Sequence, residues 1–192
     1  MERTIILASA SPRRRELMQM LGIHNLVICP AKGEEHIPEN AGPEEIVCTL
    51  SGEKAKEVWE HSPDDALVVA ADTIVWHEGR ALGKPYNEEE AAAMLRSLSG
   101  RSHEVYTGIT LVDGTGSQSK AERSVVCFRE LSDDEICRYI QSGEPMDKAG
   151  AYGAQGKGAL FVRRIDGDFF NVMGLPLCLL GQMLAGKGVQ IL

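Results

Sequence analysis

The sequence predicts a fold of the α/β or α+β class with a mixed β-sheet, and three observations point to it. Helical and extended patterns alternate along the chain. A continuous apolar run at 66–71 has the composition of a buried central strand. Two long strand patterns, 104–112 and 121–129, follow each other with only a short connection. Because a long hairpin does not fit a purely doubly wound sheet, we expect a mixed one.

The N-terminal elements are predicted to be a short strand and a helix. The strand is the apolar run Thr4–Ala8. Ser11 is a good N-cap and Pro12 suits the first helical position, so a helix is expected to start there and to stop at Gly22. The core stripe predicted for this helix consists of Leu17, Met20 and Leu21.

A second helix is predicted from Pro43 to about Trp59. Its buried face is marked by Val47, Leu50 and Val58. Lys54 falls on the same stripe, four residues from both Leu50 and Val58. Its side chain either extends past the apolar surface to water or points into a polar pocket. The spacing alone favours the first of these.

The apolar run of the predicted central strand, 66–71, ends at two polar residues, Asp72 and Thr73, and Ile74–Trp76 is predicted to extend the strand. The chain is expected to turn at Glu78–Gly79 and to return beside this strand. A turn centred there places Lys84 opposite Thr73 and close to Asp72.

The second half of the chain is predicted to add three helices and a hairpin. Ser132 and Glu135 form a capping box for the middle helix. A glycine-rich segment follows at 143–158. The predicted elements are helices 88–98, 132–141 and 175–186, and a hairpin of strands 160–165 and 169–172. The residues expected to face inward from the first two helices are Ala91, Met94, Leu95, Leu98, Ile136, Tyr139 and Ile140.

The composition is that of an ordinary globular protein of one domain or two small lobes. The chain has 192 residues, of which 43% are hydrophobic and 25% charged. Lys and Arg number 20 against 28 Asp and Glu, so the formal net charge is −8. A long non-specific nucleic-acid surface needs a basic face, so no nucleic-acid partner is expected. An acidic average is compatible with a local basic pocket for a small anion.

The cysteines and the N-terminal region predict a cytoplasmic protein. The five cysteines are odd in number and have no CxxC spacing, which favours free thiols over a zinc site or a disulfide framework. The apolar run near the N-terminus is short and positive charges follow it, so no signal peptide is expected. No apolar run approaches the length of a membrane-spanning helix, so no membrane partner is expected either.

The segment Ser9–Arg15 is the first candidate for a ligand site. A strand leads through small residues into a helix N-terminus that carries Arg13, Arg14 and Arg15. Free backbone N–H groups, the helix dipole and guanidinium groups together favour an anion. The alternative is three solvated arginines, although positive charges oppose the dipole there. Consecutive residues point in different directions, so about one arginine is expected to face a bound anion.

Three further candidate ligand sites each have a simple structural alternative. Asp72 at the end of an apolar strand must meet solvent, a cation or hydrogen-bond donors, or else it marks an ordinary turn. Glu34 and Glu35 could hold a divalent cation together with Asp72, or be surface acids. The segment 143–158 is either a flexible loop or a close approach of backbone to a ligand, with Gln155 suited to contact a base edge.

Several common catalytic motifs do not occur in the sequence. There is no GxxxxGK[ST], HExxH or GxSxG, so P-loop hydrolase, zincin and esterase functions are not supported. The five histidines have no metal-ligand spacing.

Six motifs span nearly the whole chain. They are ASASPRRREL at 8–17, AADTIV at 70–75, GKP at 83–85, LSG at 98–100, HEVYTG at 103–108 and EPMDKAGAYGAQG at 144–156. In this order they resemble the Maf family of nucleoside triphosphate pyrophosphatases. The resemblance implies one Maf-like domain over residues 1–192, with an elongated mixed sheet, flanking helices and two lobes around a central cleft. This fold is similar to that of inosine triphosphate pyrophosphatase.

The resemblance also implies a reaction. Members hydrolyse the bond between the α- and β-phosphates and release a nucleoside monophosphate and pyrophosphate. They use a divalent metal, so Mg²⁺ or Mn²⁺ is expected, and they often form dimers, so a homodimer is expected as well. The stretch KAGAYGAQG resembles the branch that cleaves dTTP and UTP.

Carried over residue by residue, the resemblance assigns roles to seven positions. Asp72 matches the proton acceptor, and with Glu35 it is the expected metal ligand. Arg13, Thr73 and Gln155 match positions that set substrate preference, and Glu35, Lys54 and Lys84 match polar residues of the cleft. Ser9, from the candidate anion site, is expected to bind substrate as well.

The resemblance leaves other functions open. Some members are associated with septum formation, so the alternative is a non-catalytic nucleotide-binding inhibitor of that process. A third interpretation is the same enzyme acting on modified pyrimidine nucleotides. Pyrophosphate release measured with a panel of nucleotides distinguishes the three.

Overall fold

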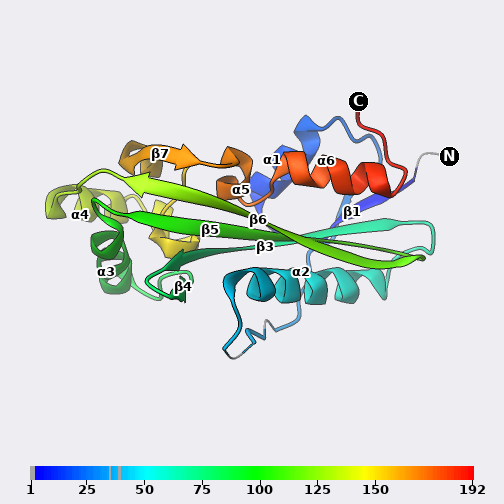
Figure 1. The fold of residues 1–192 in the computed structure, drawn as a ribbon, viewed down its shortest axis with the longest axis horizontal. Helices are drawn as coiled ribbons and strands as arrows, with labels where there is room; N and C mark the ends of the chain where they lie inside the picture. The colour runs from blue at the N-terminus through cyan, green and yellow to red at the C-terminus, as the bar shows by residue number, and fades with distance from the viewer. Residues whose placement is uncertain (1–2, 35, 39) are drawn as a thin grey trace. The chain divides into compact units, whose positions relative to one another are not determined.

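The computed structural model describes residues 3–34, 36–38 and 40–192. Strands and helices alternate along this chain (Figure 1), which confirms the predicted fold class. The strands are β1 (Ile5–Leu7), β2 (Leu26–Ile28), β3 (Leu67–His77), β4 (Arg80–Leu82), β5 (Ser102–Asp113), β6 (Gly116–Phe128) and β7 (Val162–Asp166). The α-helices are α1 (Pro12–Met20), α2 (Pro43–Trp59), α3 (Glu88–Leu98), α4 (Asp133–Gln141), α5 (Phe169–Met173) and α6 (Leu177–Gly186).

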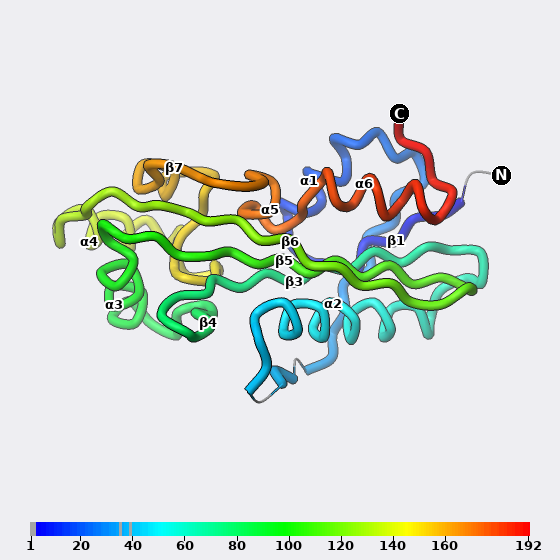
Figure 2. Tube along the Cα trace, viewed as in Figure 1, coloured from blue at the N-terminus to red at the C-terminus, as the bar shows by residue number. Residues whose placement is uncertain are grey.

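The strands form one mixed sheet in the order β2-β1-β3-β5-β6-β7, with β4 paired to β3. β1 pairs in parallel with β2 and β3, whereas β3–β4 and β6–β7 are antiparallel. The long hairpin predicted in the sequence is β5 and β6, which are separated by two residues. Figure 2 follows the chain from β5 through a tight turn into β6. The mixed sheet is therefore confirmed.

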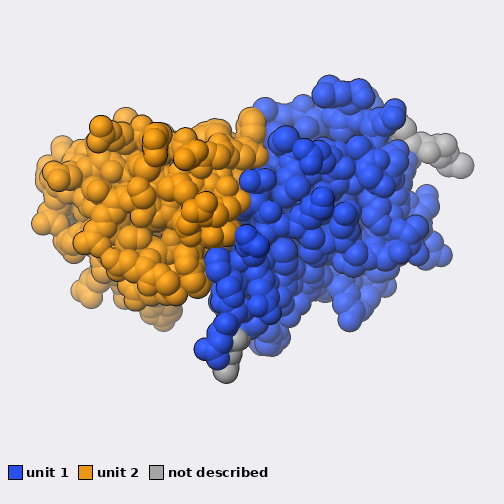
Figure 3. Space-filling view, viewed as in Figure 1, with its two compact units in different colours: residues 1–72, 107–122, 174–192 blue, residues 73–106, 123–173 orange. Residues whose placement is uncertain are grey.

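The described chain clusters into two compact units, coloured separately in Figure 3. Unit 1 consists of residues 1–72, 107–122 and 174–192, and unit 2 of residues 73–106 and 123–173. The boundaries fall inside β3, β5 and β6, so each of these strands contributes residues to both units.

Helix α1 begins where the sequence predicts, but its buried face differs. The Ser11 side chain accepts a hydrogen bond from the backbone N–H of Arg14, and Pro12 is the first helical residue. Leu17 and Met18 are buried, whereas Met20 is 66% exposed. The predicted core position of Met20 is wrong, because the buried stripe is centred on two consecutive residues and the helix has turned Met20 away from it.

Helix α2 packs very closely on the part of β5 that belongs to unit 1. A Cβ atom on Gly108 would lie 2.3 Å from the backbone oxygen of Val47. Beside this contact, the buried hydroxyls of Ser51 and Thr110 are 2.8 Å apart. Glycine in β5 thus allows the helix backbone to approach the sheet.

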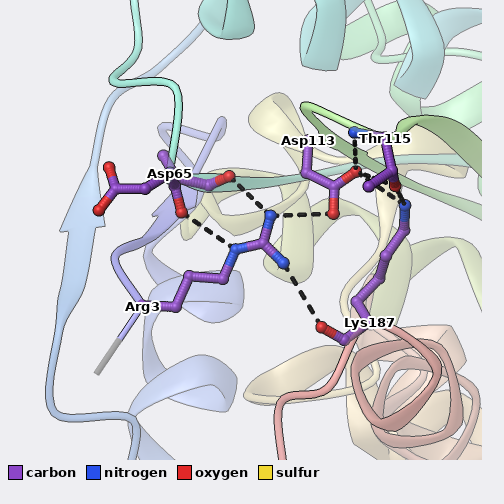
Figure 4. A network of polar contacts seen from close by, with 6 residues as sticks. Arg3, Asp65, Asp113, Thr115 and Lys187 are labelled. Atoms are coloured by element: carbon purple, nitrogen blue, oxygen red, sulfur yellow. Dashed lines mark hydrogen bonds and ion pairs between the residues drawn. The ribbon is translucent and has the colours of Figure 1, made fainter. Parts of the chain in front are cut away.

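A polar network in unit 1 is centred on Asp113, at the end of β5 (Figure 4). One carboxylate oxygen of Asp113 accepts from Arg3 at 2.9 Å, and the other accepts from Lys187 at 2.9 Å and from the Thr115 hydroxyl at 2.6 Å. Arg3 also donates to the backbone oxygen of Asp65 at 3.1 Å. Residues far apart in the sequence are thereby held together.

In unit 2, helices α3 and α4 cover a core that the sequence predicts well. The capping box of Ser132 and Glu135 is present at the start of α4. All seven residues predicted to face inward from these helices are buried, namely Ala91, Met94, Leu95, Leu98, Ile136, Tyr139 and Ile140.

The predicted hairpin 160–165/169–172 is wrong. β7 pairs instead with β6, where Val125 faces Asp166, and residues 169–173 are helical. The side chain of Asp168 accepts a hydrogen bond from the backbone N–H of Phe170 at 2.7 Å, which caps the helical turn. The glycine-rich segment before β7 forms three short 3₁₀ helices, η1 (Glu144–Asp147), η2 (Ala149–Ala151) and η3 (Lys157–Phe161).

Two predictions concern the cysteines and the membrane. All five thiols are free, as predicted. In the part of the chain that the structure describes, no helix combines the length and apolar character needed to cross a bilayer.

Candidate functional site

Asp72 lies near the middle of β3, directly after its most apolar stretch, and is 8% exposed. Lys54 of α2 donates to its Oδ1 atom at 2.5 Å, and the two side chains are only 11% and 18% exposed. Lys54 therefore does not reach past the apolar face to bulk water; it points at this carboxylate. A buried carboxylate needs such a partner, because an isolated one is very costly.

Ser9 lies at the same end of the sheet as Asp72. In the parallel pair β1–β3, Leu7 faces Val69, and the backbone N–H of Ala8 donates to the oxygen of Val69 at 2.8 Å. Ser9 follows two residues after Leu7, and Asp72 follows three residues after Val69. Both polar residues therefore lie just beyond the last paired residues of β1, as expected of a ligand-binding edge.

The three arginines of α1 have different environments. Arg14 donates from Nε to the backbone oxygen of Gly174 at 2.7 Å and from a terminal nitrogen to the Ser9 hydroxyl at 3.3 Å. Arg15 is exposed. Arg13 is half-buried and has no hydrogen bond or ion pair with any residue in the described ranges. Arg13 is thus the guanidinium that remains available for a ligand, as the sequence predicts for about one of the three.

Thr73 and Lys84 belong to unit 2. Thr73 follows Asp72 directly in β3 and is half-buried. The turn at Glu78–Gly79 and the β3–β4 pairing are present, with Val75 aligned to Leu82, but the predicted position of Lys84 opposite Thr73 lies two residues beyond the last pair and stays a prediction. The paired ladder ends at Leu82, and Lys84 is exposed.

Gln155 lies between η2 and η3 of unit 2 and is exposed. Its neighbours hold it on a defined backbone: Ala154 is 9% exposed, and Gly156 has a φ of 93°, which favours glycine. The glycine-rich segment is therefore an ordered turn rather than the flexible loop that glycine content alone suggests.

The predicted acidic metal ligands are only partly described. Glu35 lies outside the described residues, and Glu34 is exposed. Within residues 3–34, 36–38 and 40–192, no three His, Cys, Asp or Glu side chains lie together as a metal cluster. Of the two predicted metal ligands, Asp72 and Glu35, the structure describes Asp72. Its carboxylate oxygens suit a hard cation, since Mg²⁺ is commonly held by one or two carboxylates and the substrate's phosphates. The donor chemistry of Asp72 therefore fits such an ion.

A cavity of about 360 Å³ in unit 2 does not coincide with these residues. It is lined by Trp76, Glu78, Glu104 and Arg123 among others, and none of the predicted site residues borders it.

Sequence reasoning missed two polar side chains beside Gln155. Tyr139 was predicted only as a core residue, and Glu144 only as part of a motif. The Tyr139 hydroxyl donates to Oε1 of Glu144 at 3.0 Å, and both groups bond the backbone around Gln155. The one signal in the sequence was the run of glycines after Glu144, because close backbone packing needs glycine.

The chain is similar over nearly its full length to proteins named dTTP/UTP pyrophosphatase. It is 47% identical to the one from Agathobacter rectalis, an alignment that covers 97% of this chain and 98% of that relative. It is 49% identical to the one from Bacillus velezensis, over 92% and 93% of the two chains. For Methanosarcina mazei the identity is 44%, over 98% and 96%.

Solved structures with little sequence similarity share the fold. The Ham1 protein of Staphylococcus aureus matches with a TM-score of 0.52 at 14% identity, and a HAM1 protein from Coxiella burnetii with 0.50 at 18%. Both matches cover 96% of this chain and 100% of the other. They agree with the predicted inosine triphosphate pyrophosphatase-like fold.

The family model described as Maf-like protein matches residues 4–187. This range contains all six motifs of the sequence, the buried Lys54–Asp72 pair and the arginines of α1. With the near full-length relatives, it identifies this chain as a member of the Maf family.

Proposed function

We propose that this protein hydrolyses dTTP and UTP to the nucleoside monophosphate and pyrophosphate. The substrates are those named for relatives that are 44–49% identical over more than nine-tenths of the chain. One structural observation carries the chemistry: the carboxylate of Asp72, which is buried in the middle of β3 rather than at the strand end that its apolar run suggests, is paired with Lys54 at 2.5 Å.

Asp72 is the proposed proton acceptor for the attacking water. The ammonium group of Lys54 holds the carboxylate in one orientation and compensates its charge where both side chains are largely shielded from water. A positioned carboxylate that takes the proton of a nucleophile contributes about 10²–10⁴-fold to the rate of a reaction.

The triphosphate requires positive charge near its oxygens. Arg13, with no partner in the described ranges, suits this role, and the N-terminus of α1 adds the positive end of the helix dipole. Ser9 is the proposed hydroxyl donor at the same edge of the sheet. Lys84 is exposed and able to contact a phosphate.

A divalent cation, Mg²⁺ or Mn²⁺, is part of the proposal. Asp72 would hold it, with Glu35 as the second protein ligand. When bound, the ion neutralises charge on the phosphate oxygens.

Base preference is assigned to Gln155 and Thr73. The carboxamide of Gln155 offers both donors and an acceptor, which pair with the O4/N3 edge shared by uracil and thymine. Cytosine presents the reverse pattern, so an amide in fixed orientation discriminates against it.

We further propose a cytoplasmic homodimer. This assignment rests on the resemblance to family members and on the free thiols. Light scattering on the purified protein tests the dimer directly.

The proposed reaction is tested with purified protein, Mg²⁺ or Mn²⁺, and a panel of nucleotides that includes dTTP, UTP, CTP, 5-methyl-UTP and pseudo-UTP. We expect UMP and pyrophosphate in equal amounts from UTP, and TMP and pyrophosphate from dTTP. UDP and phosphate as products would contradict the assigned bond. Nucleotide binding without any product would favour the inhibitor of septum formation, and faster turnover of the modified nucleotides would identify those as substrates.

Substitution of Asp72 by Asn tests the proton acceptor. The amide preserves shape and an oxygen that accepts from Lys54, but it is a far weaker base, so kcat for UTP is expected to fall about 10²–10⁴-fold. The affinity for UTP, measured by calorimetry without added metal, is expected to change little. Asp64→Asn is the matched control, because Asp64 is an exposed acid of the same unit and its loss should leave kcat unchanged. Unchanged kcat in D72N would remove Asp72 from this role.

A further inference from the structure

The residue proposed to contact the base lies in a loop with closed ends. Gln155 is near the middle of residues 153–158, and the two glycines at the ends touch, since a Cβ atom on Gly158 would lie 2.4 Å from the backbone oxygen of Gly153. Any substitution at Gly158 would push these ends apart.

A single hydroxyl–carboxylate pair bonds both ends of this loop. On one side, the backbone N–H of Gly153 donates to the Tyr139 hydroxyl at 3.2 Å. That hydroxyl donates in turn to Oε1 of Glu144 at 3.0 Å. On the other side, Oε1 accepts from the N–H of Gly158 at 3.1 Å and Oε2 accepts from the N–H of Lys157 at 3.0 Å. Three backbone donors of the loop therefore end on Tyr139 and Glu144.

The pair is itself held in place by the core and by η1. Tyr139 is 4% exposed, and its ring packs edge-on against Phe161 with centroids 4.9 Å apart. Lys148 donates to the backbone oxygen of Glu144 at 2.5 Å. A loop bonded to such fixed groups has little freedom to move.

Both groups have the protonation state that these bonds require. Burial raises the pKa of Tyr139, so the hydroxyl keeps its proton and can donate it. Burial opposes ionisation of Glu144, but the N–H donors of Gly158 and Lys157 outweigh it and lower the pKa of this carboxyl.

We propose that Tyr139 and Glu144 are positioning residues that fix the loop 153–158, so that Gln155 presents its amide to the nucleobase in one orientation. This inference rests on the proposed function. Because an amide that is free to turn can match either uracil or cytosine, discrimination depends on the anchor as well as on the glutamine.

The variant Tyr139→Phe isolates the hydroxyl. It keeps the buried ring and its packing on Phe161, but removes the acceptor for Gly153 and the donor to Glu144. Binding is measured by calorimetry with the non-hydrolysable analogues α,β-methylene-UTP and α,β-methylene-CTP in the presence of Mg²⁺. We expect the preference for the UTP analogue to fall about fivefold, the equivalent of one lost hydrogen bond.

Two comparisons separate positioning from general loss of stability. Tyr106→Phe is the matched control, because it removes a buried tyrosine's hydrogen bond to a carboxylate, Glu104 at 3.1 Å, elsewhere in unit 2. It should leave the preference unchanged. In a Gln155→Ala background, Tyr139→Phe should cause no further loss of preference, since the group that it positions is gone.

Amide hydrogen exchange gives a readout that needs no nucleotide. In Tyr139→Phe, exchange at Gly153 and at Lys157–Gly158 should accelerate, whereas in Tyr106→Phe it should not. Unchanged preference in Tyr139→Phe, or an equal further loss in the Gln155→Ala background, would overturn the inference. A wild-type protein that prefers the UTP analogue but never releases pyrophosphate would contradict the proposed reaction and leave the positioning role intact.

Discussion

His103 shows how strongly burial can act on one side chain. It lies in β5, is 2% exposed, and its Nε2 atom is 2.7 Å from the Tyr152 hydroxyl oxygen. Its ring packs edge-on against Phe128 and Tyr152, with centroids 5.0 and 5.3 Å away. Burial, with a smaller contribution from His77, lowers the pKa of His103 to about 3. The imidazole is therefore neutral in the folded protein at pH values above about 3.

This neutral histidine predicts a pH dependence of stability. The unfolded chain takes up a proton near pH 6.5, the ordinary histidine pKa, whereas the folded chain does so only near pH 3. The contribution of His103 is thus constant above about pH 6.5, and as the pH falls towards 3 the free energy of unfolding decreases by about 1.4 kcal/mol per pH unit.

The test is the slope of the free energy of unfolding against pH, from urea melts between about pH 6.5 and pH 4. His103→Gln should flatten the slope even though it lowers the overall stability. His24→Gln, at an exposed histidine, should keep the wild-type slope. An equally steep slope in H103Q would show that another group is responsible.

At single residues, the sequence predicts burial better than it predicts polar partners. Spacing places Lys54 and Tyr139 correctly on buried faces, but it does not reveal that Lys54 meets Asp72 or that Tyr139 bonds Glu144. Periodicity reports the direction of a side chain from its own helix, whereas its partner comes from an element elsewhere in the chain. The individual roles of the site residues come from motif resemblance and stay predictions.

At the scale of the elements, the close contact of α2 with β5 depends on the absence of a side chain at Gly108. The backbone of α2 at Val47 lies so close to Gly108 that even a methyl group does not fit, since the added Cβ atom would meet two backbone atoms of Val47 within 2.5 Å. These backbone atoms cannot move aside to relieve the contact, whereas the end of a flexible side chain could.

Gly108→Ala is therefore expected to destabilise the protein by about 3 kcal/mol or more, or to prevent folding. Gly52→Ala is the matched control, in the interior of α2, where the nearest atom to an added Cβ is the Thr110 hydroxyl oxygen at 4.0 Å. Since alanine favours a helix over glycine, this variant should be stabilised by about 1 kcal/mol. Thermal melts of both proteins check the prediction, and a fully stable G108A would contradict the close contact.

The elements that the sequence predicts correctly are those with local signals. The helices at 43–59 and 88–98 have periodic apolar faces, and the one at 133–141 has a capping box. The three-residue strand β2 was missed because so short a segment has no usable periodicity. The hairpin at 160–172 was assigned wrongly because the partner of β7 is β6, some forty residues earlier, which no local pattern specifies.

For the molecule as a whole, the Asp113 network joins all three chain segments of unit 1. Arg3, Asp113 and Lys187 come from the first, second and third segment in turn. Burial opposes ionisation of Asp113, but hydrogen bonds from Thr115, Lys187 and Arg3 outweigh it and lower the pKa of this carboxyl well below its usual range. Asp113 is therefore ionised in the folded protein, and its negative charge is part of what holds the three segments of unit 1 together.

Asp113→Asn is expected to lower the free energy of unfolding at pH 7 by roughly 3 kcal/mol, because two cations lose their buried counter-charge. Since the folded pKa is depressed, the contribution is complete above the unfolded value of about 4 and is lost as the pH falls below it. The difference in the free energy of unfolding between wild type and D113N, measured by urea melts, should therefore become smaller below about pH 4. Asp64→Asn, at an exposed acid, should leave the free energy of unfolding unchanged. If the difference between wild type and D113N stayed the same at every pH, lost packing rather than lost charge would be its cause.

The division of the chain has a consequence for how such a protein can change by recombination. The backbone passes from one unit to the other four times, at 72/73, 106/107, 122/123 and 173/174, and three of these passages lie within strands. No single crossover between two related genes can exchange either unit whole. Because unit 1 contains the first and the last of these segments, a single crossover within the chain always produces a protein whose unit 1 is mixed, and exchange of a whole unit requires a crossover at each of the four passages.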